Sequence, residues 1–319
     1  MSVLVASPPS SPQRARSRAL SLALAAASKP APLLDVPTEL GLAILELALT
    51  HTPLRTLASL SRAFNTLIAA ILYRQVILDT PQKLALFART IRGKTPDFVE
   101  SHVKTLAVTI EHWRFTPASN MDLETIIAVC SGVRILSLPR PRILALSRHS
   151  RILPSELTLQ SFDLSSVESC SGGTLQMAHS LSHLRIAEPG DLWNSPLSIL
   201  AFFGGVPHLS HLALARRMDA NTDNDVVFVD EVQAILESRP RLKMLVVRIF
   251  PAYFPLYCGQ GMESSSIWTA LEVVAESDPR LMLVAAGQDT SKLSWAHLPG
   301  DDFWEDSMKK WEARSPPPK

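Results

Sequence analysis

The pattern of apolar and polar residues over positions 33–78 predicts three short helices followed by a strand. Asp35 and Pro37 mark the start of the first helix, because an Asp side chain caps free amides and Pro is tolerated in the first turn. Pro53 begins the second helix, and Ser61 can cap the third. The first helix has an apolar stripe at i, i+4 and i+7, which consists of Leu40, Ile44 and Leu47.

The second and third helices add more apolar residues than three short helices can bury against one another. These residues are Leu54, Leu57 and Leu60 in the second helix and Phe64, Leu67, Ile68 and Ile71 in the third. The strand follows directly and contains Val76 and Leu78. A unit this small is marginal by itself, and its surplus apolar surface therefore predicts a docking module.

Beyond residue 80, an apolar anchor followed by apolar residues three and five positions later recurs along the chain. The segments are Val103/Leu106/Val108, Val133/Leu136/Leu138, Leu159/Phe162/Leu164, Leu181/Leu184/Ile186, Leu209/Leu212/Leu214, Leu242/Leu245/Val247 and Leu281/Val284/Ala286. Helical patterns precede most of them; one starts at Ser195-Pro196 and stops at Gly204-Gly205. Helices alternating with short strands over residues 79–298 predict an α/β fold with parallel strands.

Successive side chains of a strand point to opposite faces, so residues two and four positions after each anchor are expected on the face away from the helices. Neighbouring strands lie about 4.8 Å apart, which predicts that Asp163 pairs with Arg185 and that His183 lies beside His211. We expect the polar middle of this face to bind a target protein, although such residues can also merely solvate an exposed sheet. The expected target-binding residues are Ser161, Asp163, His183, Arg185, His211 and Met244.

The two ends of the chain differ from the rest. Residues 1–32 contain no acidic residue and are rich in Ser, Pro and Ala, which is typical of a disordered leader; a targeting segment is the alternative. Residues 299–319 contain Trp304, Met308 and Trp311 at i, i+4 and i+7. This spacing predicts an amphipathic helix that caps the open end of the last repeat, or one that binds a partner.

Composition excludes several classes of function. The net charge is only +1, which gives no reason to expect nucleic acid or a membrane surface as a partner. The three cysteines are widely spaced and form no CxxC, which favours a reducing compartment, cytoplasmic or nuclear, over a disulfide framework or a thiolate zinc site. Phosphate-loop, nucleophile-elbow and metalloprotease motifs do not occur. We therefore expect a protein that is not an enzyme and has no cofactor or metal.

The order of residues over 33–78 resembles an F-box, in the form common in fungal proteins. The resemblance rests on Val36-Pro37, Glu39-Leu40, Ile44-Leu45, Leu57, Leu60-Ser61-Arg62, Phe64-Asn65, Leu67 and Leu72-Tyr73-Arg74-Gln75-Val76. The third helix has Ala63 and Phe64 where animal members often have Cys and Trp. The segments over 79–298 resemble degenerate leucine-rich repeats, without the asparagine ladder of that family.

The F-box resemblance implies that the chain binds the Skp adaptor of a cullin-type ubiquitin ligase and presents a target to it. The adaptor-binding residues it implies are Val36, Pro37, Leu40, Ile44, Leu45, Leu57, Leu60, Phe64 and Leu67. Three alternatives stay open: a scaffold whose F-box-like helices only cap its own repeats, an ordinary α/β domain in place of repeats, and an enzyme whose site is too dispersed to recognise.

Overall fold

The computed structural model describes residues 36–53, 56, 57, 59–110, 114–140, 152–163, 179–252, 261–286 and 303–314. The chain divides into two compact units, Met1–Ile71 and Leu72–Lys319. The predicted leader and Asp35 lie outside the described residues.

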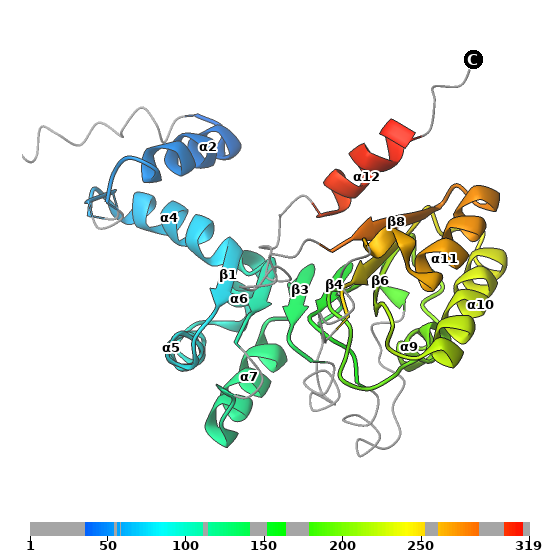
Figure 1. Ribbon diagram of the computed structural model, residues 1–319. Coiled ribbons are helices and arrows are strands. Elements are labelled where there is room, and N and C mark those ends of the chain that lie inside the picture. The colour runs from blue at the N-terminus through cyan, green and yellow to red at the C-terminus, as the bar shows by residue number, and fades with distance from the viewer. Residues whose placement is uncertain are drawn as a thin grey trace, which may run out of the picture. The chain divides into compact units, whose positions relative to one another are not determined.

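The first unit contains α2 (Thr38–Leu49) and most of α4 (Arg62–Arg74), which continues into the second unit (Figure 1). The backbone N–H of Phe64 donates to the hydroxyl of Ser61 at 3.2 Å, which confirms the predicted cap of the third helix. Pro37 holds the N-cap position of α2 without a side-chain hydrogen bond. The predicted second helix runs from Pro53 to Leu60, and residues 54, 55 and 58 of it lie outside the described residues, so the three-helix arrangement is not confirmed.

The second unit is an α/β structure with one sheet, in which every strand is parallel to its neighbours. The strands follow one another across the sheet in chain order. They are β1 (Gln75–Leu78), β2 (Thr105–Val108), β3 (Ile135–Leu138), β4 (Glu156–Leu159), β5 (His183–Ile186), β6 (His211–Arg217), β7 (Met244–Phe250) and β8 (Leu281–Ala285). The strand predicted after the third helix is thus β1, the first strand of the sheet.

Helices lie between several of these strands, and one of them, α9 (Pro196–Phe202), is where Ser195-Pro196 and Gly204-Gly205 predicted a helix. The helices are α5 (Pro81–Arg92), α6 (Pro96–His102), α7 (Pro117–Val129), α9, α10 (Thr222–Ser238), the short η5 (Met262–Ser264) and α11 (Ser266–Ser277). The first four begin with Thr-Pro or Ser-Pro, and in each the hydroxyl accepts a backbone N–H of the first turn. Gly204 and Gly205 have positive φ and end α9 as predicted.

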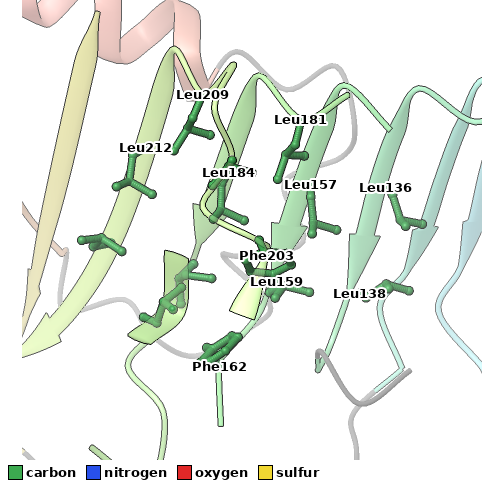
Figure 2. Packing of buried hydrophobic residues seen from close by; sticks show 14 of the residues in the cluster. Leu136, Leu138, Leu157, Leu159, Phe162, Leu181, Leu184, Phe203, Leu209 and Leu212 are labelled. Atoms are coloured by element: carbon green, nitrogen blue, oxygen red, sulfur yellow. The ribbon is translucent and has the colours of Figure 1, made fainter. Parts of the chain in front are cut away.

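The main core lies between the sheet and these helices. Leucines at matching positions on neighbouring strands form a continuous row across the sheet, as Figure 2 shows. The row includes Leu106, Leu136, Leu157, Leu184, Leu212 and Leu245. Each fully buried leucine contributes about 1.5–3 kcal/mol relative to an exposed one, so the row is a major part of the stability of the unit.

The register of the sheet corrects the sequence alignment at two strands. Leu157, not Phe162, is in register with Leu136, and Leu281, not Val284, is in register with Leu245. Both alignment errors are an odd number of residues, and an odd shift moves every side chain to the opposite face of the sheet. Ser161 and Asp163 were therefore assigned wrongly: both follow the end of β4 and do not lie on a strand. Leu283 and Ala285 were likewise placed on the wrong face, since Leu283 lies in the main core.

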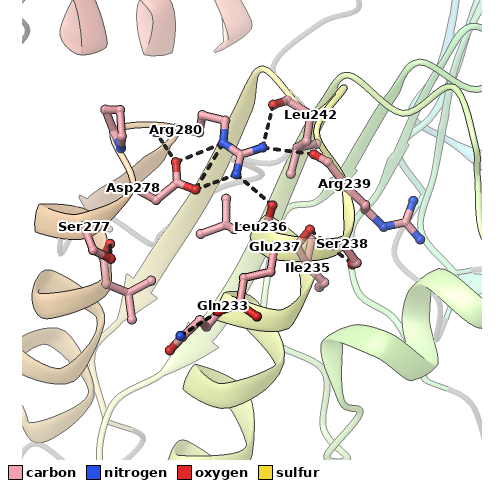
Figure 3. A network of polar contacts seen from close by, with 12 residues as sticks. Gln233, Ile235, Leu236, Glu237, Ser238, Arg239, Leu242, Ser277, Asp278 and Arg280 are labelled. Atoms are coloured by element: carbon pink, nitrogen blue, oxygen red, sulfur yellow. Dashed lines mark hydrogen bonds and ion pairs between the residues drawn. The ribbon is translucent and has the colours of Figure 1, made fainter.

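A polar network explains why the alignment failed at β8. Asp278 occupies the anchor position, three residues before Leu281, where most of the other segments have a large aliphatic residue. Its carboxylate accepts from the guanidinium of Arg280, which also donates to the carbonyls of Leu236, Arg239 and Leu242, as Figure 3 shows. The ion pair lowers the pKa of the Asp278 carboxyl. This network joins the end of α10 to the start of β8 in place of an apolar contact.

Candidate functional site

The last helix, α12 (Phe303–Arg314), lies on the face of the sheet opposite the main core (Figure 1). Its apolar side packs on a small second cluster of strand residues. The buried strand residues of this cluster are Ala213, Met244, Val246 and Met282, and the helix contributes Phe303, Trp304, Met308 and Trp311. We call the strand surface under the helix the α12 face; it comprises this cluster with Glu156, His183, Arg185 and His211.

The predicted amphipathic helix is confirmed, but its predicted place at the open end of the last repeat is wrong. Trp304 reaches Glu156 of β4, whereas the Nε1 of Trp311 donates to the carbonyl of Pro279, just before β8, at 2.6 Å. The helix therefore crosses several strands and covers the middle of the face for which the sequence predicted a target.

His183 and His211 are stacked, with ring centroids 4.2 Å apart and planes 6° from parallel, as predicted. Ser182 and Ser210, the residues before them, orient both rings. Each serine hydroxyl lies 2.9 Å from the Nδ1 of the following histidine and donates to a carbonyl of the preceding segment. Because that carbonyl takes the hydroxyl hydrogen, Nδ1 has to donate to the serine oxygen. The signal for this arrangement in the sequence is the repeated Leu-Ser-His-Leu, at 181–184 and 209–212.

Trp304 lies against both histidines, with its ring centroid 5.5 Å from each. Its indole N–H donates to the Glu156 carboxylate at 3.2 Å. Burial raises the pKa of Glu156, while the Trp304 hydrogen bond and the charge of Arg185 act in the opposite direction. The Arg185 guanidinium lies 3.8 Å from the centre of the Phe303 ring, a cation–π arrangement. Sequence reasoning missed Glu156 because of the register error at β4.

The structure brings together only part of the predicted target-binding set. His183, Arg185, His211 and Met244 belong to the α12 face. The predicted pair between Asp163 and Arg185 is wrong, because Arg185 is in register with Thr158 and Ala213.

Acid is expected to weaken the α12 face. Burial lowers the pKa of His183, and burial together with His183 and Lys243 lowers the pKa of His211 to about 4. The unfolded chain takes up these protons near pH 6.5, so the unfolding free energy falls as the pH drops from about 6.5 towards 4. The raised pKa of Glu156 acts in the opposite direction, because the folded state binds its proton first.

Urea unfolding at about pH 7 and about pH 4.5 tests this dependence. We expect the double variant His183→Gln/His211→Gln to lose less stability between the two pH values than the unsubstituted protein. Equal losses in the two proteins would contradict the assignment of the effect to the histidine stack.

The first unit presents a different kind of surface. Leu40, Ile44 and Leu47 of α2 are 56%, 47% and 66% exposed and form one side of the helix, which we call the α2 stripe. Of the other predicted adaptor-binding residues, Pro37 and Leu60 are exposed, and Val36, Leu57 and Leu67 are half-buried. Leu45 and Phe64 are buried, which assigns them to packing and not to a contact surface.

A hollow of about 320 Å³ lies at the carboxyl ends of β5 and β6, where α/β proteins often bind ligands. Its charged side chains have structural partners. Gln160 donates to Glu188 at 3.1 Å, Arg140 lies 3.6 Å from Asp191, and Arg217 donates to the carbonyl of Pro251; Arg216 pairs with Asp225.

Among the described residues, no group of three or more His, Cys, Asp or Glu side chains is arranged to hold a metal ion. In the same part of the chain, no helix combines the length and the apolar character that crossing a membrane requires. Comparison of the chain with models of protein families, with curated proteins and with solved structures gave no match.

Proposed function

We propose that this chain is the substrate-recognition subunit of a Skp–cullin–F-box type ubiquitin ligase. In this proposal the first unit binds the Skp adaptor through the α2 stripe, and the second unit, an irregular leucine-rich-repeat-like solenoid, binds the target protein. Ubiquitin transfer is carried out by the other subunits, so the chain acts by bridging and needs no catalytic group of its own.

The observation that carries the proposal is the exposure of the α2 stripe. Three large aliphatic side chains on one side of a twelve-residue helix leave apolar surface in water, which is unfavourable unless a partner covers it. The order of F-box-like residues around the stripe supports the Skp adaptor as that partner.

The solenoid interpretation is supported by the order of the sheet. Strands that follow one another in chain order, with the described helices between them packed in one core, are expected when similar units stack in sequence. Tyr73, in the last turn of α4, packs on Phe87 and Phe98 within the second unit.

Replacing Leu40 and Leu47 by aspartate is expected to weaken binding of the purified Skp adaptor by on the order of 100-fold or more, because each lost apolar anchor at an interface centre costs about 2 kcal/mol. Titration of the full chain with the adaptor measures this. The matched control is Leu86→Asp, at an exposed position of α5 outside the stripe, which should bind as the unsubstituted protein does. Absence of adaptor binding by the unsubstituted protein would refute the proposal.

A further inference from the structure

The contact between α12 and the sheet is smaller and more polar than the main core. All four aromatic and apolar residues of α12 in this contact stay partly accessible to water. The surface beneath them includes Glu156, His183, Arg185 and His211, which are ionisable groups that an apolar cover must remove from water. Such burial is costly, so the contact is weaker than its aromatic content suggests.

The contact is also incomplete. Beside α12 there is a hollow of about 420 Å³. It is lined by Lys310 and Ala313 of α12, by Trp268 of α11, and by Met282 and Val284 of β8. A helix of twelve residues is marginal in water by itself, and α12 therefore depends on this contact for its own stability. Loss of the contact and loss of the helix are thus coupled.

The contacts that do form are directional and define what the face accepts. An indole N–H meets the Glu156 carboxylate, an aromatic ring meets the Arg185 guanidinium, and a second indole N–H meets the carbonyl of Pro279. Leucine or valine could not make these contacts. The helix that makes these contacts is amphipathic, with an aromatic pair, an apolar residue four positions after its first tryptophan and a second tryptophan three positions further on.

We propose that the α12 face is a docking site for a partner helix with this pattern, and that α12 occupies the site as an internal competitor. The seating of α12 is the observation that identifies the occupant: it shows the shape, the donors and the aromatic positions that fit. A partner helix that also fills the hollow beside α12 gains apolar contact that α12 does not make. The identification of this partner as a ubiquitination target rests on the proposed function, but the binding itself does not.

The probe is a fluorescent synthetic peptide with the sequence of residues 303–314. It is titrated with the full chain, with Lys309→Pro and with Lys309→Ala. Lys309 is on the exposed side of α12, so Pro breaks the helix without removing a contact to the sheet, and Ala is the matched control. We expect Lys309→Pro to bind the peptide at least about tenfold more tightly than the unsubstituted chain or Lys309→Ala does, because α12 then no longer covers the α12 face.

Two further variants make the result specific. A peptide with both tryptophans replaced by alanine should not bind, and Glu156→Ala in the Lys309→Pro chain should weaken binding about tenfold through loss of the indole acceptor. Equal binding by all three chains, or no binding by Lys309→Pro, would overturn the proposal. A dimer of the unsubstituted chain that Lys309→Pro converts to a monomer would also overturn it and assign the face to a second copy. None of these variants alters the α2 stripe, so failure of adaptor binding remains a separate result.

Discussion

Replacement of Asp225 by alanine is expected to lower the free energy of unfolding by about 3–5 kcal/mol, since it leaves a buried guanidinium without its counter-charge. Both side chains of the Arg216–Asp225 pair are less than a tenth exposed. The Nε and Nη2 of Arg216 donate to the same carboxylate oxygen at 2.8 and 2.6 Å. The guanidinium also lies 4.5 Å from the centre of the Trp193 ring. The pair thus joins β6 to the start of α10.

Burial, with a smaller contribution from the charge of Asp219, raises the pKa of Asp225, while the Arg216 partner acts in the opposite direction. The net direction is upward, so the surroundings as a whole disfavour the charged carboxylate. We therefore expect the pair to affect stability mainly when one partner is removed, because the remaining charge is then buried without a counter-charge. The double variant Arg216→Met/Asp225→Leu, which removes both charges, should unfold within about 1 kcal/mol of the original protein. Urea unfolding of Arg216→Met, of Asp225→Leu and of the double variant measures the coupling between the two side chains. A loss of unfolding free energy below about 1 kcal/mol for Asp225→Ala would contradict the expected cost of the unpaired guanidinium.

Replacement of Gly132 by alanine is the second large effect, expected to cost about 3 kcal/mol or more because a methyl group would overlap a backbone carbonyl. The turn before β3 passes so close to α6 that an added Cβ would lie 1.8 Å from the carbonyl oxygen of Glu100. That oxygen also accepts a hydrogen bond from the ammonium of Lys104 at 2.7 Å, so moving it away from the added methyl group would disturb this bond. Relief would require the turn, α6 or both to move.

Gly261 is the matched control for this substitution, because nothing lies within 4 Å of a Cβ added there. Gly261→Ala should change the free energy of unfolding by less than about 0.5 kcal/mol. The two variants can be compared by thermal or urea unfolding. Similar stability of Gly132→Ala and Gly261→Ala would show that the close approach of the turn to α6 is not maintained in solution.

The sequence predicted the parallel α/β fold well wherever its apolar repeat was continuous. The segments around Leu106, Leu136, Leu184, Leu212 and Leu245 lie in the predicted register. The prediction failed where another residue takes the anchor position. Pro154 stands there before β4, and Asp278, neutralised by Arg280, stands there before β8. Neither residue is distinguishable from a loop residue by apolar periodicity.

The candidate site was predictable from the sequence only where the strand register was correct. The stack of His183 and His211 follows from strand alternation and register alone, and both were correct at β5 and β6. The position of α12 was not predictable, because the spacing of Trp304, Met308 and Trp311 defines an apolar side but not the surface that it covers. The contact with Glu156 required both the correct register of β4 and that position.

In the proposed complex the α2 stripe, and not the sheet, receives the adaptor. Amide hydrogen exchange of the full chain with and without the Skp adaptor tests it most directly. We predict slower exchange in α2 and the first turns of α4 on addition of the adaptor, with β4–β8 and α12 unchanged. The Leu40→Asp/Leu47→Asp variant should show no such protection. Unchanged exchange in α2 at saturating adaptor, or protection confined to the sheet, would contradict the account.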